Sequence, residues 1–173
     1  MSQVPAWFER KFDLSFPAAH FPYILARLRG TPARLEEIFR PCNHETLVAK
    51  REGKWSPQEH AGHLLELEAL WLERVKDFET SRNVLTAADL SNRGTDAANY
   101  NAQSLPEILS RFRSARSILL SRTERFSPKD FNRTLLHPRL KQPMRLVDHL
   151  FFVAEHDDHH LATVWELIRG APA

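Results

Sequence analysis

The chain has 173 residues, of which 27% are charged and 42% hydrophobic, and its formal net charge is +2. This composition is typical of one soluble domain over residues 1–173, and it excludes a disordered, collagen-like or disulfide-stapled protein. The small net charge predicts no nucleic-acid partner, and the single Cys42 cannot form an internal disulfide. We find no signal peptide and no apolar run near the ~20 residues that cross a bilayer, so we expect a cytoplasmic protein with no membrane partner.

The first two predicted helices differ in how clearly they begin. Phe21 to Phe39 has helical periodicity, but it contains Gly30-Thr31-Pro32, so Pro32 either kinks one long helix or begins a second one. Ser56-Pro57-Gln58-Glu59 combines an N-cap serine, a proline at the first helical position and a glutamate that can complete a capping box. This motif predicts a helix over about 57–79.

The second half of the chain predicts two more helices. Ser104-Leu105-Pro106-Glu107 repeats the capping pattern and begins a helix over about 105–126. The last helix is expected from Pro143 or Met144 to Arg169, where Gly170 ends it. Residues 81–103 and 127–142 are predicted connections, and no segment alternates in hydrophobicity as a strand would. The sequence therefore predicts an all-α four-helix bundle.

Nine histidines stand out, and four of them lie between His149 and His160 in the last predicted helix. Successive helical residues are rotated by about 100°, which places His149, His156 and His160 in the middle of the apolar face. His156 and His160 are four residues apart, so their rings can converge on one ion. His149 lies about 10 Å further along the helix axis, and His159 points towards the acidic side.

The helix over 57–79 has His63 on its apolar face and His60 one turn earlier. One histidine from this helix and two from the last would give three imidazoles around a divalent ion. Such a site keeps a fourth position for water or substrate, which is typical of catalytic rather than structural metal sites. Another interpretation stays open, in which these histidines are hydrogen-bonded core residues of a non-catalytic bundle.

The segment Trp55-Ser56-Pro57-Gln58-Glu59-His60-Ala61-Gly62-His63-Leu64, followed by His156-Asp157-Asp158-His159-His160, resembles the DinB/YfiT-like family of metalloenzymes. Leu28-Arg29-Gly30-Thr31-Pro32-Ala33-Arg34-Leu35 and His137-Pro138-Arg139-Leu140 extend the resemblance to about residues 20–169. It implies an up-down four-helix bundle, often a homodimer, that holds a divalent ion, most commonly zinc or nickel. The implied ligands are His63, His156 and His160.

The resemblance leaves two reactions open. Some relatives transfer low-molecular-weight thiols such as bacillithiol or mycothiol, and others are metal-dependent hydrolases. A hydrolase usually needs a carboxylate near the ion as general base. Glu59 and Glu66, about 40° and 60° from His63 on their helix, are the nearest candidates, but capping or solvated roles suit them better. We therefore expect a thiol S-transferase acting on small electrophiles with such a thiol as cosubstrate, and a hydrolase is the alternative.

Other side chains are assigned less directly. The helical positions of His60, Glu66, Trp71 and His149 make them candidates for the wall of the pocket, which we expect to hold a small-molecule substrate. The arginines of the helix over about 105–126 spread to both of its sides. They therefore form no single basic stripe for nucleic acid.

Overall fold

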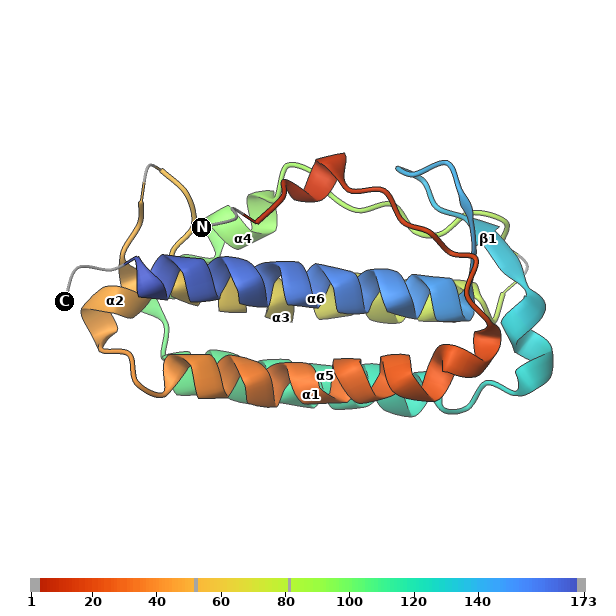
Figure 1. The fold of residues 1–173 in the computed structure, drawn as a ribbon, viewed down its shortest axis with the longest axis horizontal. Helices are drawn as coiled ribbons and strands as arrows, with labels where there is room; N and C mark the ends of the chain where they lie inside the picture. Colours follow the sequence, from red (N-terminus) through yellow and green to blue (C-terminus); the bar gives the residue numbers. More distant parts are fainter. Residues whose placement is uncertain (1–3, 52, 81, 171–173) are drawn as a thin grey trace.

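The structure, a computed structural model, describes residues 4–51, 53–80 and 82–170. Four long helices form a bundle (Figure 1), which confirms the predicted fold: α1 (Phe21–Phe39), α3 (Pro57–Asp77), α5 (Leu105–Thr123) and α6 (Leu146–Arg169). The connections contain the short helices α2 (His44–Val48) and α4 (Arg93–Ala97) and the single 3-10 turns Trp7–Glu9, Ala18–His20, Tyr100–Ala102 and Pro128–Asn132.

Local chemistry explains how two of the long helices form. Ser56 accepts from the backbone N–H of Glu59 at 3.1 Å, and the Glu59 carboxylate accepts from the Ser56 N–H at 2.9 Å, so the predicted capping box is present. Pro32 lies inside α1, which continues as one helix. Because a proline has no N–H, the carbonyl four residues earlier is left without its helical donor. This carbonyl, that of Leu28, accepts from the Arg116 guanidinium at 3.0 Å instead.

The segment before α6 differs from the prediction. Pro143–Arg145 is not the first turn of the last helix but a strand, β2, which pairs antiparallel with β1 (Thr134–Leu136). The last helix therefore begins later than predicted, and the strands were not predicted because three residues are too short to show alternation. Asp148 fixes the start of α6 by accepting from the backbone N–H of Arg145 at 2.8 Å.

The helices pack in a ring in which α1 and α3 each contact both α5 and α6. In Figure 1, α1 and α6 run in one direction and α3 and α5 in the other. The consecutive helices α3 and α5 are therefore parallel, unlike in a simple up-down bundle, and the connection over 78–104 returns along the length of the bundle. This connection, the N-terminal segment and the β-hairpin lie along the α6 side of the bundle (Figure 1). No described helix is both long and apolar enough to span a membrane.

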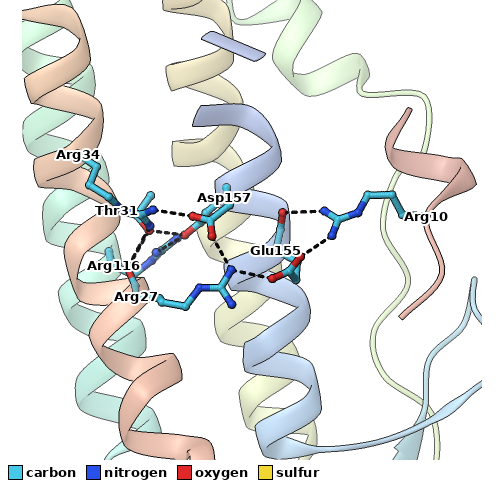
Figure 2. A network of polar contacts seen from close by, with 8 residues as sticks. Arg10, Arg27, Thr31, Arg34, Arg116, Glu155 and Asp157 are labelled. Atoms are coloured by element: carbon cyan, nitrogen blue, oxygen red, sulfur yellow. Dashed lines mark hydrogen bonds and ion pairs between the residues drawn. The ribbon is translucent and has the colours of Figure 1, made fainter. Parts of the chain in front are cut away.

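A network of polar contacts ties α6 to α1, α5 and the N-terminal segment (Figure 2), and its buried part lies around Arg116. Arg116, which is 1% exposed, donates to Asp157 at 2.6 Å and to Glu68 at 2.6 Å. Thr31 also donates to Asp157, at 2.8 Å. Asp157 therefore faces α1 and α5, and its neighbour His156 extends from another side of α6.

Candidate metal centre

Three buried histidines meet between α3 and α6. His63, from the first turns of α3, and His156 and His160, from α6, each offer one ring nitrogen, and these nitrogens all lie within 4.8 Å of one another. The Nε2 atoms of His156 and His160 are 3.1 Å apart. Two imidazole nitrogens in a tetrahedral zinc site, each 2.0–2.1 Å from the ion, are about 3.3 Å apart. The donor set and its spacing therefore fit a divalent ion.

A chain of hydrogen bonds orients the His63 ring. Its Nδ1 lies 3.0 Å from the hydroxyl of Thr95, and this hydroxyl donates to the Glu66 carboxylate at 2.9 Å. Because the Thr95 proton is directed to Glu66, its oxygen accepts the proton of His63 Nδ1. The Nε2 atom of His63 then keeps a free lone pair. Metal-binding histidines are commonly oriented by such partners at the second ring nitrogen.

His160 has a different partner. Its Nδ1 lies 2.8 Å from Nδ1 of His60, which is buried one turn before His63 on α3. The sequence predicts His60 on the same side of α3 as His63. In the structure, His60 contacts the second ring nitrogen of His160 and is not one of the three converging histidines. His156 has no such partner, because its Nδ1 is buried without a hydrogen bond. Its ring instead packs edge-on against the rings of Trp7 and Trp71.

The surroundings keep these rings neutral. Burial, followed by the nearby His159, lowers the pKa of His60 to about 4, and burial with the nearby His60 lowers that of His63 to about 3. Burial lowers the pKa values of His156 and His160 well below the ordinary range, with further contributions from the neighbouring histidines. Neutral imidazoles have free lone pairs at pH 7, as metal ligands require.

The three histidines form one end of a cavity of about 780 Å³. Its wall comes from α3 and α6, from the N-terminal segment, from residues 87–92 and from the turn of the β-hairpin. Apolar side chains such as Leu67, Leu70 and Phe152 line its middle. The volume suits a small organic molecule.

The pocket candidates occupy different places. Trp71 lines the cavity, and His60 lines a smaller adjoining pocket. Glu66 and His149 are not among the lining residues. Glu66 bonds Thr95, and His149 is fully buried 5.9 Å from the Trp71 ring, measured between ring centroids.

The structure also adds residues that the sequence did not assign to the pocket. His159, expected to point away, is half-buried and lines the cavity. Trp55 contacts His63 with its ring centroid 4.6 Å away, and Trp7 reaches the site from the N-terminal segment. Thr95 lies in a short helix inside a predicted connection, where no periodicity marks a side chain as buried.

Two glycines let the connection over 78–104 approach α3. A Cβ atom at Gly62 would lie 2.1 Å from the Tyr100 ring, and one at Gly94 would lie 1.7 Å from a carboxylate oxygen of Glu66. Neither distance is compatible with a side chain in the present arrangement. The absence of a Cβ at these positions therefore allows Thr95 to reach His63.

The carboxylates near the site are already engaged. Glu59 caps α3 and pairs with Lys50, and Glu68 faces Arg116. Among the described residues that line the cavity, Asp89 is the only acidic one, and it accepts from the backbone and hydroxyl of Ser91. No carboxylate of this wall is thus buried beside the three histidines.

Comparisons with known proteins agree with this architecture. The sequence profile of the DinB superfamily matches residues 27–164. The structure of YfiT from Bacillus subtilis, described as a probable metal-dependent hydrolase with an unusual four-helix bundle topology, matches with a TM-score of 0.81 and 20% identity over 93% of both chains. A mycothiol-dependent maleylpyruvate isomerase matches with a TM-score of 0.66 and 10% identity, over 88% of this chain and 66% of that one. No curated protein sequence is a significant match.

Proposed function

The chain belongs to the DinB superfamily, and we propose that it is a metal-dependent enzyme that acts on a small molecule held between α3 and α6. His63, His156 and His160 hold the divalent ion, zinc or nickel. The strongest support is the convergence of three neutral, buried imidazoles at one end of a largely apolar cavity. A divalent ion at such a site supplies a Lewis acid that favours the deprotonated form of a thiol or of water.

The preferred reaction is transfer of a low-molecular-weight thiol to a small electrophile. In this reaction the thiol releases its proton to the solvent, and its sulfur forms a bond to the electrophilic carbon as the leaving group departs, so no separate base beside the ion is required. This suits a wall whose only described carboxylate, Asp89, is exposed and already bonded. The chain's own residues orient two of the imidazoles, through Thr95 and His60, and exclude water with apolar side chains.

Hydrolysis is the second candidate. His159 lines the cavity with its ring centroid 5.3 Å from that of His160, so an imidazole outside the set of three faces the same space. A histidine in this position can accept a proton from water during attack on an ester or amide. The description of YfiT as a probable metal-dependent hydrolase is consistent with this alternative.

Metal content tests the site. Protein purified without a histidine tag should contain about one equivalent of zinc or nickel by elemental analysis. His156→Ala and His160→Ala should lose most of it, since two imidazoles bind such an ion far more weakly than three. His44→Ala, which changes an exposed histidine outside the site, is the matched control. Equal metal content in all four proteins would contradict the assignment.

Turnover distinguishes the two reactions. The metal-loaded protein should consume an alkylating electrophile such as 1-chloro-2,4-dinitrobenzene only when a thiol, mycothiol or bacillithiol, is present. Cleavage of 4-nitrophenyl esters without any thiol would favour the hydrolase. If the protein binds metal but shows neither activity, thiol transfer is contradicted for these substrates. The assignment of the metal centre is then unaffected.

A further inference from the structure

The cavity has a second end that the three histidines do not reach. Arg74 lies three turns beyond His63 on α3, which is about 16 Å at 1.5 Å per residue. Arg74, His137 and Arg139 line the cavity there, Arg74 from the last turns of α3 and the other two from the β-hairpin turn. One end of the cavity thus has the three imidazoles, whereas the other has two guanidinium groups.

Arg74 is buried without a direct counterion. Its side chain is 2% exposed, and its Nε donates to the carbonyl of Thr86 at 2.8 Å. Among the described residues, no carboxylate forms an ion pair with it, and the nearby Asp77 accepts from the Thr86 N–H at 2.6 Å and pairs with Arg82. Burial lowers the pKa of Arg74 to about 10, so the group is still cationic at pH 7. A buried cation of this kind normally has an anionic partner.

Two further donors at this end lack acceptors. One Nη atom of Arg139 is buried without a hydrogen bond, although its guanidinium packs over the Phe8 ring at 5.2 Å. The indole Nε1 of Trp71, whose ring lies 5.3 Å from the Arg74 guanidinium carbon, is also buried without a partner. Unsatisfied buried donors are rare in native proteins and indicate a missing acceptor.

The His137 ring shows the same excess of donors. Its Nδ1 lies 3.2 Å from the backbone N–H of Arg139 and 3.1 Å from that of Leu140, and its Nε2 lies 3.2 Å from Nη1 of Arg74. A neutral imidazole has one acceptor nitrogen and one N–H. Hydrogen-bond donors therefore face both ring nitrogens, although only one of these nitrogens can accept. At least one of the donors has no acceptor in the protein.

We propose that this end of the cavity binds an oxyanion group, carboxylate or phosphate, of the molecule on which the enzyme acts. Guanidinium groups bind both kinds of oxyanion through paired, charge-assisted hydrogen bonds. The apolar wall formed by Leu67, Leu70 and Phe152 then contacts the body of the molecule. The identification of this ligand as a substrate depends on the proposed function, whereas binding of the oxyanion does not.

Binding to chelator-treated wild-type protein tests the proposal without any metal. We would titrate 3-phenylpropionate, phenyl phosphate and the neutral 3-phenylpropionamide, and follow binding by calorimetry. At least one of the two anions should bind about tenfold or more tightly than the amide, because charge-assisted hydrogen bonds to a guanidinium are lost in the amide. The anion that binds more tightly identifies the group. Equal binding of all three compounds would overturn the proposal.

Variants locate the site. Arg139→Gln should weaken binding of the preferred anion about tenfold or more, whereas Arg111→Gln, which changes an exposed arginine on α5, should not. Arg139 is only half-buried, so this variant serves even if Arg74→Gln fails to fold. Unchanged affinity in Arg139→Gln, or the same loss in Arg111→Gln, would overturn the assignment.

His156→Ala separates this proposal from the metal centre. This variant should lose metal and still bind the anion, because the two ends of the cavity are distinct. Anion binding without metal uptake by the wild-type protein would contradict the proposed function alone. Metal uptake without anion binding would contradict the oxyanion site alone.

Discussion

The three central histidines differ in how their second ring nitrogen is satisfied. His63 uses the Thr95 hydroxyl, His160 uses His60, and His156 has no partner at Nδ1. Partners at this position fix the tautomer and the ring orientation, so they contribute to metal affinity without touching the ion. The three ligands should therefore respond differently when their neighbours are changed.

Thr95→Val tests the partner of His63. Valine has nearly the same shape as threonine but no hydroxyl, so Nδ1 of His63 and the Glu66 carboxylate both lose a partner. Zinc affinity should fall about 10- to 100-fold, the usual effect of removing an outer-shell partner. Competition with a chromophoric chelator measures this change. Thr46→Val, in α2, is the control, and equal affinities in the two variants would contradict the role of Thr95.

The histidines of the site, His60 included, could be predicted from the sequence, whereas the side chains that the connections supply could not. His63, His156 and His160 lie on apolar faces of long helices, where a period of 3.6 residues shows which side chains are buried. Thr95 and Arg139 come from connections, and their positions depend on how these segments pack against α3 and α6. No local pattern in the sequence contains that information.

At the scale of the helices, Arg116 joins all four members of the bundle. It extends from α5 and contacts Glu68 on α3, the Leu28 carbonyl on α1 and Asp157 on α6. Helix α6 supplies two of the three candidate ligands, so its position relative to α3 sets the spacing of the site. In Figure 2, the contacts of Asp157 with Arg116 and Thr31 hold this position from α5 and α1.

Arg116→Met should be strongly destabilising. It leaves two buried carboxylates without their shared cation, and breaking a buried ion pair in this way costs about 3–5 kcal/mol. Urea unfolding measures the loss. Arg113→Met, which removes an exposed pair with Glu36 on the same helix, should cost at most about 1 kcal/mol. Similar losses in both variants would show that Arg116 contributes no more than a surface charge.

The helices themselves were predictable and the hairpin was not. Capping residues and periodicity located the four helices to within a few residues, because these signals act locally. The strands Thr134–Leu136 and Pro143–Arg145 form because Leu135 and Met144 are buried against the bundle, which is a tertiary effect. Similarly, α1 continues through Pro32 because Arg116, distant in sequence, satisfies the carbonyl that the proline leaves free.

At the scale of the whole molecule, the buried histidines make stability depend on pH. Burial, together with Arg74 and Arg139, lowers the pKa of His137 to about 3. The pKa of His137 in the unfolded chain is near 6.5, so the unfolded chain binds the proton first as the pH falls. The contribution of His137 to the free energy of unfolding is therefore complete above pH 6.5 and is lost between pH 6.5 and 3. The free energy of unfolding should therefore decrease over this range, by up to about 1.4 kcal/mol per pH unit from this group.

Comparison with a variant isolates this contribution, because other groups titrate as well. Burial raises the pKa of Glu68 to about 7, which acts in the opposite direction. Urea unfolding of the metal-free protein at pH 7, 6 and 5 should show a smaller pH dependence for His137→Asn than for the wild type. His44→Asn should retain the wild-type slope. An unchanged slope in His137→Asn would mean that His137 contributes nothing.

Metal binding should stabilise the whole fold, since the unfolded chain does not hold the three histidines together. Zinc at 100 times its dissociation constant adds about 2.7 kcal/mol, which corresponds to a rise in Tm of roughly 5–10 °C for a domain of this size. Thermal unfolding with zinc and with chelator measures the difference. His156→Ala should show almost none of it, and an equal shift in this variant would place the bound zinc elsewhere.

The close approach at Gly62 and Gly94 has a thermodynamic consequence. The connection over 78–104 provides Thr95, which orients His63, and also residues 87–92 of the cavity wall. Movement of this segment away from α3 would therefore deprive His63 of its partner Thr95 and weaken metal binding. Because linkage between two equilibria is reciprocal, a bound ion would in turn favour the position of the segment against α3. Entry of the substrate and retention of the metal would then be opposing demands on a single segment.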